Sequence, residues 1–547
     1  MSFIDKIFPN PLPTIDEIEN KYKRRTLPEG AKVTRVAPSP TGFMHIGGIY
    51  AGLINERLAH QSEGVFFLRI EDTDTKREVE GATELICSSL ANYGITADEG
   101  FDANGNEIGS YAPYKQSERK EIYQAYIKQM LADGRAYPCF ATQEELDELR
   151  KNQELSGARP GYYGRYAKYR DLSPEKIEEK LDAGIPFVIR FKSNGSYNNK
   201  IVIQDGLKGK INFPENDLDV VIMKSDGLPT YHFAHVIDDY LMGTTHVIRG
   251  DEWLSSLPLH VQMFKSMGFK APKYTHIAPI QKMDGDSRRK LSKRHDPEAD
   301  VRYYDTVGYP KVAVIEYLLN LANSSFEDWR RNNKDKSYKE FPVSLNKLSP
   351  SGALFDFVKL NNISKEIVAQ MTTDEIFKNT YDWAKNHDEK LYSLMNSTPD
   401  YVKSILSIER TGAKNARKDI AKYSDVLGEI IYFFDEDFKL SEEAKSELKS
   451  IPQSKEIVNV YIPMFDENDS KEEWFAKMQN LASQFNYAQN AKMFKENPEQ
   501  YNGDISQVVK IFRILLTGKT QTPDLSEIQH TMGKERVLNR LKEIENI

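Results

Sequence analysis

Apolar residues recur along the chain with a period that changes, and the changes predict the order of secondary-structure elements. A short apolar segment at 33–37 leads into a loop rich in proline and glycine. Apolar positions at helical spacing follow within 46–58, and a continuous apolar run occupies 65–70. Such a run is typical of a strand that is covered on both faces. Together the segments predict a strand–helix–strand unit of a parallel sheet, with a right-handed crossover.

Later apolar segments indicate where this sheet resumes. Residues 116–219 are mixed, with a basic, tyrosine-rich loop and a strand at 187–191, and we interpret them as an inserted domain. Apolar strands return at 220–223, 246–249 and 276–280. We expect these three strands to form the second half of the parallel sheet.

Beyond about residue 300 the strand signal fades and helical periodicity takes over. Apolar residues recur at helical spacing within 314–321, 426–434, 474–485 and 508–516. The pattern therefore predicts an α/β region followed by a mainly α-helical C-terminal region. At the other end, residues 1–30 form an extension in which Thr14 and Glu17 make a capping-box pattern for a short helix.

Composition narrows the class of protein. The chain has 547 residues, 39% of them hydrophobic and 29% charged, as in a soluble protein with several cores. Two cysteines, Cys87 and Cys139, are too few for a disulfide framework or a four-thiolate zinc site. We expect no signal peptide, and no run of about 18 apolar residues predicts a membrane span. The net charge of −8 argues only weakly against nucleic acid, because binding depends on a local basic face.

One candidate nucleotide site lies where the first predicted strand turns into its helix. The segment 35–48 reads RVAPSPTGFMHIGG, which places His45, Gly47 and Gly48 at the start of the helix. Free N–H groups at a helix N-terminus attract phosphate, and glycines let a nucleotide approach the backbone closely. A histidine there can donate to a phosphate oxygen as charge develops. Taken alone, however, the pattern favours a structural turn.

A second candidate is the basic segment KLSKR at 290–294, which Arg288 and Arg289 precede. A solvated loop is the usual meaning of such a run, but a lysine pair in a loop is also suited to neutralising a triphosphate. A sparser basic cluster within 410–422 fits a solvated helix face as well as it fits a nucleic-acid contact.

The two motifs together resemble those of class I aminoacyl-tRNA synthetases, which carry one in each half of a Rossmann-type parallel sheet. Longer strings resemble the glutamyl subgroup of bacterial type. They are RVAPSPTGFMHIGG at 35–48, RIEDTD at 69–74, PTYHFA at 229–234, VIRGDEW at 247–253, LTG at 516–518 and GKERVL at 533–538. The last two resemble its helical anticodon-binding region, so the resemblance covers residues 31–547.

This resemblance implies a role for each matching residue. ATP would be bound by His45, Gly47, Gly48, Glu252, Lys290 and Lys293, of which His45 and Lys293 would be catalytic. Glutamate would be bound by Arg35, Ala37, Ser39, Glu71, Tyr231, His235 and Arg249. Arg35 and Arg249 would hold the side-chain carboxylate, because a guanidinium matches it in charge and geometry. Glu71 would take the substrate ammonium.

The implied reaction is ATP-dependent ligation of L-glutamate to tRNA(Glu) through a glutamyl-adenylate, with transfer to the 2′-OH of the terminal adenosine. Mg²⁺ would travel with ATP, because no carboxylate cage is evident; we expect no metal-binding residue and no bound zinc. We expect a cytoplasmic monomer that does not contact membranes. The implied domains are an N-terminal extension at 1–30, a Rossmann catalytic domain with halves at 31–115 and 220–285, an inserted acceptor-stem domain at 116–219, a stem-contact domain at 286–375 and a helical anticodon-binding region at 376–547.

His235 departs from the glutamyl pattern, because many glutamyl enzymes have asparagine there and glutaminyl enzymes often have histidine. The string APSPTG at 37–42, Arg249 and the helical C-terminal region favour glutamate. The alternatives are a non-discriminating enzyme that also glutamylates tRNA(Gln), a glutaminyl-tRNA synthetase, and an inactive RNA-binding paralogue. Intact His45 and Lys293 argue against the paralogue.

Other conspicuous polar residues have simpler interpretations. We expect Asp72 and Asp74 to cap the helix that follows them, because acidic residues favour that position. His232 and His276 are predicted to be structural histidines.

Overall fold

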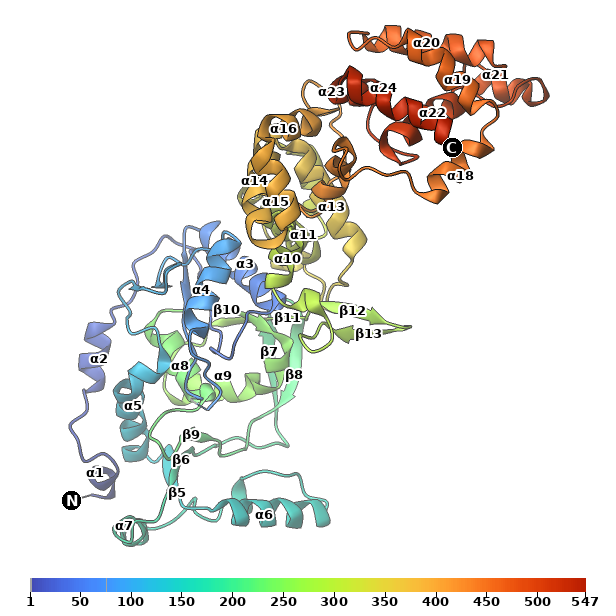
Figure 1. The fold of residues 1–547 in the computed structure, drawn as a ribbon. Helices are drawn as coiled ribbons and strands as arrows, with labels where there is room; N and C mark the ends of the chain where they lie inside the picture. The colour runs from blue at the N-terminus through green and yellow to red at the C-terminus, as the bar shows by residue number, and fades with distance from the viewer. Residues whose placement is uncertain (1, 75) are drawn as a thin grey trace. The chain divides into compact units, whose positions relative to one another are not determined.

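The computed structural model describes residues 2–74 and 76–547, which form two compact units (Figure 1). The first unit comprises residues up to 303 together with 315–356, and the second comprises 304–314 together with 357–547. Each unit has a hydrophobic core of its own. Across the described ranges, no helix combines the length and the hydropathy that a membrane span requires.

The first unit contains strands and the helices that cover them. Its strands are β1 (Val33–Val36), β2 (Val65–Leu68), β3 (Gly100–Phe101), β4 (Glu107–Ile108), β5 (Ala136–Cys139), β6 (Val188–Phe191), β7 (Lys200–Asp205), β8 (Gly209–Pro214), β9 (Val221–Met223), β10 (His246–Gly250), β11 (Lys273–Ile277), β12 (Gln281–Asp284) and β13 (Ser287–Lys290). Its helices are α1 (Phe3–Ile7), α2 (Ile15–Lys21), α3 (Ile46–His60), α4 (Ala82–Asn92), α5 (Lys120–Ala132), α6 (Gln143–Leu155), α7 (Pro174–Asp182), α8 (Tyr231–Leu241), α9 (Leu257–Ser266) and α12 (Phe326–Asn332).

The second unit is helical. Its helices are α13 (Phe357–Gln370), α14 (Thr373–His387), α15 (Glu389–Ser397), α16 (Pro399–Ser407), α17 (Asp425–Ile430), α18 (Glu442–Ser450), α19 (Ser454–Tyr461), α20 (Lys471–Gln484), α21 (Ala491–Glu496), α22 (Ile505–Thr517), α23 (Leu525–Met532) and α24 (Lys534–Lys542). Two further helices, α10 (Arg302–Val307) and α11 (Lys311–Ala322), contain residues of both units. The predicted helical C-terminal region is therefore confirmed.

A parallel arrangement of strands lies at the centre of the first unit. β1 pairs with β2 in parallel, with Val33 opposite Val65, and α3 provides the crossover between them. β10 pairs with β11 in parallel, and it lies beside β1, where the Thr245 N–H donates to the Val33 carbonyl at 3.0 Å. These contacts confirm the strand–helix–strand unit and join it to the later strands.

A hairpin extends this arrangement on the far side of β11. β7 and β8 pair in antiparallel fashion, and β7 meets β11 in parallel where Asp205 lies opposite Tyr274. Gly206 follows directly, and a Cβ atom there would collide with the Thr275 side chain. The glycine therefore lets the end of β7 approach β11 closely, which brings Asp205 toward the interior.

The strand at 220–223 has a different partner from the one predicted. β9 runs antiparallel to β6, and with β5 it forms a separate three-stranded sheet. The expectation that it continues the parallel sheet is therefore wrong. A short apolar run indicates burial, but it carries no information on the direction of its neighbour.

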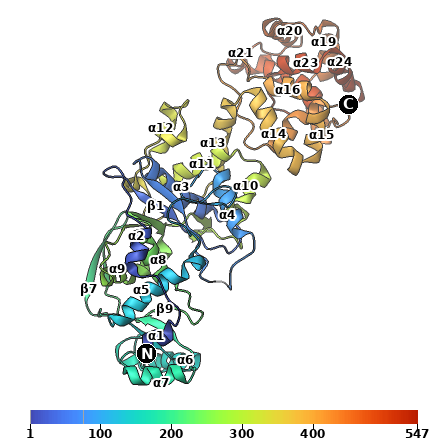
Figure 2. The ribbon, with the colours of Figure 1, turned by 90° about the vertical axis from the view of Figure 1, so that its left-hand side faces the viewer.

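The N-terminal extension packs along the first unit. Thr14 and Glu17 form the predicted capping box at the start of α2. The side chain of Tyr22 stacks on Tyr111, and α1 lies against α7 of the inserted region (Figure 2). The extension thus contacts both the inserted region and the segments around the parallel strands.

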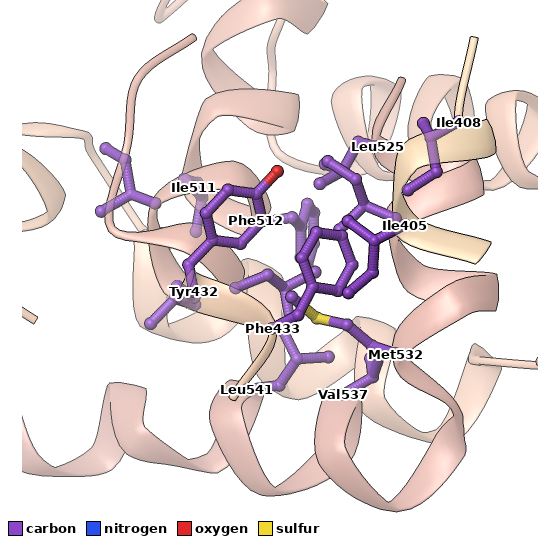
Figure 3. Packing of buried hydrophobic residues seen from close by; sticks show 14 of the residues in the cluster. Ile405, Ile408, Tyr432, Phe433, Ile511, Phe512, Leu525, Met532, Val537 and Leu541 are labelled. Atoms are coloured by element: carbon purple, nitrogen blue, oxygen red, sulfur yellow. The ribbon is translucent and has the colours of Figure 1, made fainter. Parts of the chain in front are cut away.

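The core of the second unit is formed where several helices converge. Side chains from α16, α22, α23 and α24 meet Tyr432 and Phe433, which lie in a short 3-10 helix (Ile431–Phe433) (Figure 3). Phe433, Ile511 and Phe512 are fully buried. Burial of large apolar and aromatic side chains is the main stabilising contribution in such a helical assembly.

Candidate active site

A cleft of about 300 Å³ opens at the carboxyl ends of β10 and β11, beside the start of α3. In open α/β sheets this edge is the usual place for a ligand. Five residues that the sequence assigned to ATP line it: His45, Gly47, Gly48, Glu252 and Lys290. Residues from both motifs therefore meet around one cavity, although more than 200 positions separate them in the chain.

His45 links the two motifs directly. Its Nδ1 accepts a hydrogen bond of 2.9 Å from the Gly47 N–H, which caps the N-terminus of α3. The ring proton therefore lies on Nε2, which donates to the Leu291 carbonyl at 3.2 Å. Burial lowers the pKa of His45 below its usual value, so the neutral ring is the main form at neutral pH.

Lys293 contacts the loop that leads into α3. Its Nζ donates to the Phe43 carbonyl, two residues before His45. Lys290, in contrast, lies at the end of β13 and faces the cleft. Both ammonium groups of the KLSKR segment thus lie around the turn that leads into α3.

The residues predicted to bind glutamate form a second group around Tyr231. The Tyr231 hydroxyl accepts from Arg249 NH1 at 3.3 Å, and its ring packs on Trp253 with centroids 4.2 Å apart. Burial raises the pKa of Tyr231 to about 12, and the nearby Glu71 carboxylate adds to this shift. Ala37 and Ser39 lie in the loop after β1, with Ala37 half-buried and Ser39 exposed.

Arg35 and Glu71 belong to a buried network that the sequence did not predict. Arg35 Nε lies 3.3 Å from both oxygens of Asp239, and Arg69 NH1 donates to the same carboxylate at 2.8 Å. Arg69 NH2 donates to Glu71 at 3.0 Å. Although burial opposes it, Arg35 and Arg69 hold the pKa of Asp239 well below its usual value. Asp239 therefore stays charged and compensates the two guanidinium groups.

His235 lies beside Asp239 and is fully buried. Its Nδ1 donates to Asp239 at 2.8 Å, and its Nε2 accepts from the Tyr274 hydroxyl at 3.0 Å. Burial lowers the pKa of His235 to about 3, so the ring is neutral. Both of its nitrogens are thus engaged within the protein.

Asp72 and Asp74 do not cap the following helix, as the sequence analysis expected. Asp72 instead accepts from the backbone N–H of Ser117 at 2.7 Å, at the start of a distant 3-10 helix (Gln116–Arg119). Asp74 pairs with Arg77, and α4 begins at Gly81 without a side-chain cap. The capping prediction was therefore wrong, because the loop between the acids and α4 is longer than a cap permits.

The chain matches known protein families over most of its length. Residues 32–362 match the model of the class I tRNA synthetase (E and Q) catalytic domain, and residues 375–545 match an anticodon-binding domain. A glutamate–tRNA ligase of Clostridium perfringens is 51% identical over 98% of both chains. The chain belongs to the glutamate–tRNA ligase family.

More distant relatives preserve the similarity over the whole chain. The glutamate–tRNA ligase of Sorangium cellulosum is 45% identical over 96% of this chain and 97% of its own. The crystal structure of a glutamate tRNA ligase from Elizabethkingia meningosepticum, in complex with its amino acid, matches with a TM-score of 0.75 at 28% identity. That match covers 94% of this chain and 99% of the solved one.

Several buried polar residues of this family member escaped sequence reasoning. Asp239 lies beside Arg35 and His260 beside Arg249, but no motif spacing marks these two residues, and Arg69 was noted only as the first residue of the string RIEDTD. The one available signal was their occurrence within apolar helix or strand segments, which also fits an ordinary structural role. His276, predicted to be structural, contacts Arg249.

The cysteines of this synthetase take part in ordinary packing. Cys87 and Cys139 are buried free thiols, and Cys139 donates to the Tyr162 hydroxyl at 3.4 Å. Among the described residues, no group of three or more metal-ligating side chains lies together.

Proposed function

We propose that this chain ligates L-glutamate to tRNA in two steps, using ATP. In the first, an oxygen of the glutamate α-carboxylate attacks the α-phosphate of ATP, which forms glutamyl-adenylate and releases pyrophosphate. In the second, the 2′-OH of the terminal adenosine of tRNA(Glu) attacks the adenylate carbonyl and releases AMP. The observation that carries the proposal is the cleft lined by residues of both nucleotide motifs, with Arg249 directly before Gly250 of its lining.

The nucleotide cleft suits the first step. The free N–H groups at the start of α3 and the ammonium groups of Lys290 and Lys293 can neutralise a triphosphate and the departing pyrophosphate. Mg²⁺ would accompany ATP, bound mainly by phosphate oxygens and water, as is usual for this ion. The protein contributes position and charge rather than covalent chemistry.

The amino-acid pocket favours glutamate over glutamine. A carboxylate can accept from the guanidinium donors, whereas an amide would direct its own N–H groups toward them. Unpaired buried donors of this kind cost about 1–3 kcal/mol each. His235, the residue that suggested glutamine, has both ring nitrogens engaged by Asp239 and Tyr274, which supports glutamate.

Pyrophosphate exchange into ATP tests the proposed substrate. With the purified chain and total tRNA, we expect exchange with glutamate and none with glutamine. Only glutamate has a side-chain carboxylate to pair with the guanidinium groups. Exchange with glutamine alone would overturn the substrate assignment. Charging of separate glutamate and glutamine isoacceptors with labelled glutamate would show whether tRNA(Gln) is also a substrate.

A further inference from the structure

The guanidinium of Arg249 is held by partners that carry no net charge. Arg249 Nε donates to His276 Nε2 at 3.0 Å, and NH2 lies 3.2 Å from His260 Nδ1. NH2 also donates to the Trp253 carbonyl at 3.4 Å, and the guanidinium lies over the ring of Tyr274. With the Tyr231 hydroxyl on NH1, every contact recorded for this side chain is to a neutral acceptor or an aromatic face.

Arg249 differs in this respect from the other arginines of the pocket. Arg35 and Arg69 lie within ion-pair distance of Asp239, and Arg69 also pairs with Glu71. Over the described residues, the structure records no ion pair for Arg249, although only 6% of its surface is exposed. A buried cation without a carboxylate partner is costly unless a ligand supplies the negative charge.

The two histidines are fixed as acceptors by their own partners. His276 Nδ1–H donates to the buried Asp205 carboxylate at 2.7 Å, which leaves the unprotonated Nε2 to accept from Arg249. On the other side, His260 Nε2 lies 2.9 Å from His232 Nδ1, so it can donate there while its Nδ1 accepts from Arg249. Burial lowers the pKa of both His260 and His276, which keeps the rings neutral.

Asp205 is linked to Arg249 through the ring of His276, which lies between them. Its oxygens accept from the backbone N–H groups of Leu207 at 2.9 Å, Lys208 at 2.8 Å and His276 at 3.1 Å. These donors satisfy the carboxylate locally. The close approach at Gly206 holds it in place against β11.

We propose that His260 and His276 are positioning residues that orient Arg249 through neutral acceptor nitrogens, so that its positive charge is reserved for the side-chain carboxylate of the substrate. The inference rests on the proposed glutamate specificity and explains how the protein achieves it. A carboxylate in place of either ring would hold the guanidinium equally well but would compensate its charge. Selectivity for an acidic over an amide side chain would then be lost.

The variants His260→Asn and His260→Asp separate orientation from charge. Both place an oxygen near the position of Nδ1 and have nearly the same shape, and both lose the contact to His232. In charging assays with the full chain, we expect the KM for glutamate to be at least about tenfold higher in H260D than in H260N. This factor corresponds to the loss of one hydrogen bond with a charged group. The ratio of kcat/KM for glutamate over glutamine should fall in parallel, with the KM for ATP the same in both variants.

Equal KM values for glutamate in H260N and H260D would overturn the inference. If H260D does not fold, as its melting curve would show, the pair His276→Gln and His276→Leu provides the test. The glutamine side chain would retain an acceptor near the position of Nε2 and the leucine side chain would not, so the KM for glutamate should be about tenfold higher in the leucine variant. Equal KM values for glutamate in the two His276 variants would also overturn the inference. A wild-type chain that does not use glutamate would instead refute the proposed function itself.

Discussion

A single imidazole connects the two nucleotide motifs at the scale of residues. His45 caps α3 through Nδ1 and donates to the Leu291 carbonyl through Nε2, so both of its ring nitrogens are in use. If His45 Nε2–H donates to a phosphate oxygen, as proposed, that bond replaces its contact with the Leu291 carbonyl of the KLSKR segment. We therefore expect nucleotide binding to be coupled to the position of this segment, which contains Lys293.

Replacement of Lys293 by alanine tests the role of this lysine. We expect Lys293→Ala to reduce glutamate-dependent pyrophosphate exchange by about 10²–10³-fold, because it removes the positive charge proposed to stabilise the departing pyrophosphate. Binding of tRNA, measured by filter retention, should change little. Lys334→Ala, at an exposed position of the same unit, is the matched control and should behave as wild type. Unchanged exchange in Lys293→Ala would exclude the lysine from the reaction.

Sequence strings predicted which pocket residues would gather, but not how their charges are balanced. Arg35, Glu71 and Arg249 come together as expected. Asp239, in contrast, follows an apolar stretch of α8, where neither its spacing nor its type distinguishes it from a surface acid. Charge compensation depends on which side chains meet across strands and helices, and that is set by tertiary packing.

At the scale of elements, one side chain of α24 links the end of α22 to a 3-10 helix. Gly518 ends α22 in the left-handed conformation, with φ of 69°. The nearby Leu516 carbonyl accepts from Arg540 NH1 on α24 at 2.5 Å, and the same nitrogen donates to the Tyr432 carbonyl. Arg540 thus satisfies backbone groups that the end of α22 and a 3-10 helix leave without helical partners.

Replacement of Arg540 should destabilise the helical unit. In Arg540→Met the carbonyls of Leu516 and Tyr432 lose a buried donor, so we expect the free energy of unfolding to fall by about 1–3 kcal/mol. Urea denaturation followed by circular dichroism would measure this. Arg536→Met, one helical turn earlier and paired with Asp435 at a more exposed site, is the control and should change stability by less than about 1 kcal/mol. Equal losses in the two variants would contradict the argument.

Elements with strong periodicity were predicted well and short ones were not. Periodic apolar positions located α3, α11, α20 and α22 to within a few residues. The three residues of β9 were assigned to the wrong sheet, because such a run specifies a buried strand but not its neighbour. Pairing of short strands is decided by segments far away in the sequence.

At the scale of the whole chain, a largely buried ion pair joins the N-terminal extension to the rest of the first unit. Arg25 NH1 and NH2 each lie 2.6 Å from an oxygen of Glu99, and Arg25 Nε donates to the Met242 carbonyl at 2.8 Å. The Tyr114 hydroxyl donates to the same carboxylate at 2.7 Å. Removing Arg25 would therefore leave a carboxylate poorly compensated in a region of low exposure.

We expect Arg25→Met to lower the free energy of unfolding of the first unit by about 3 kcal/mol, as is usual when one partner of a buried pair is removed. Thermal unfolding would show this as a lower midpoint. Lys6→Met is the matched control, because its ion pair with Asp182 is exposed to solvent, and its midpoint should stay at the wild-type value. A wild-type midpoint for Arg25→Met would mean that the extension contributes little to stability.

The division of the chain into units limits which segments could be exchanged with those of a related enzyme. Residues 304–314 belong to the second unit but precede the last stretch of the first. In this segment the carbonyls of Asp305, Val307 and Gly308 accept from Trp383, Ser424 and Tyr423, each at 2.8 Å. A genetic exchange that replaced everything after residue 356 would separate these acceptors from their donors. The helical unit is therefore encoded by two separate pieces of sequence, and we expect a functional chimera to need both from the same parent.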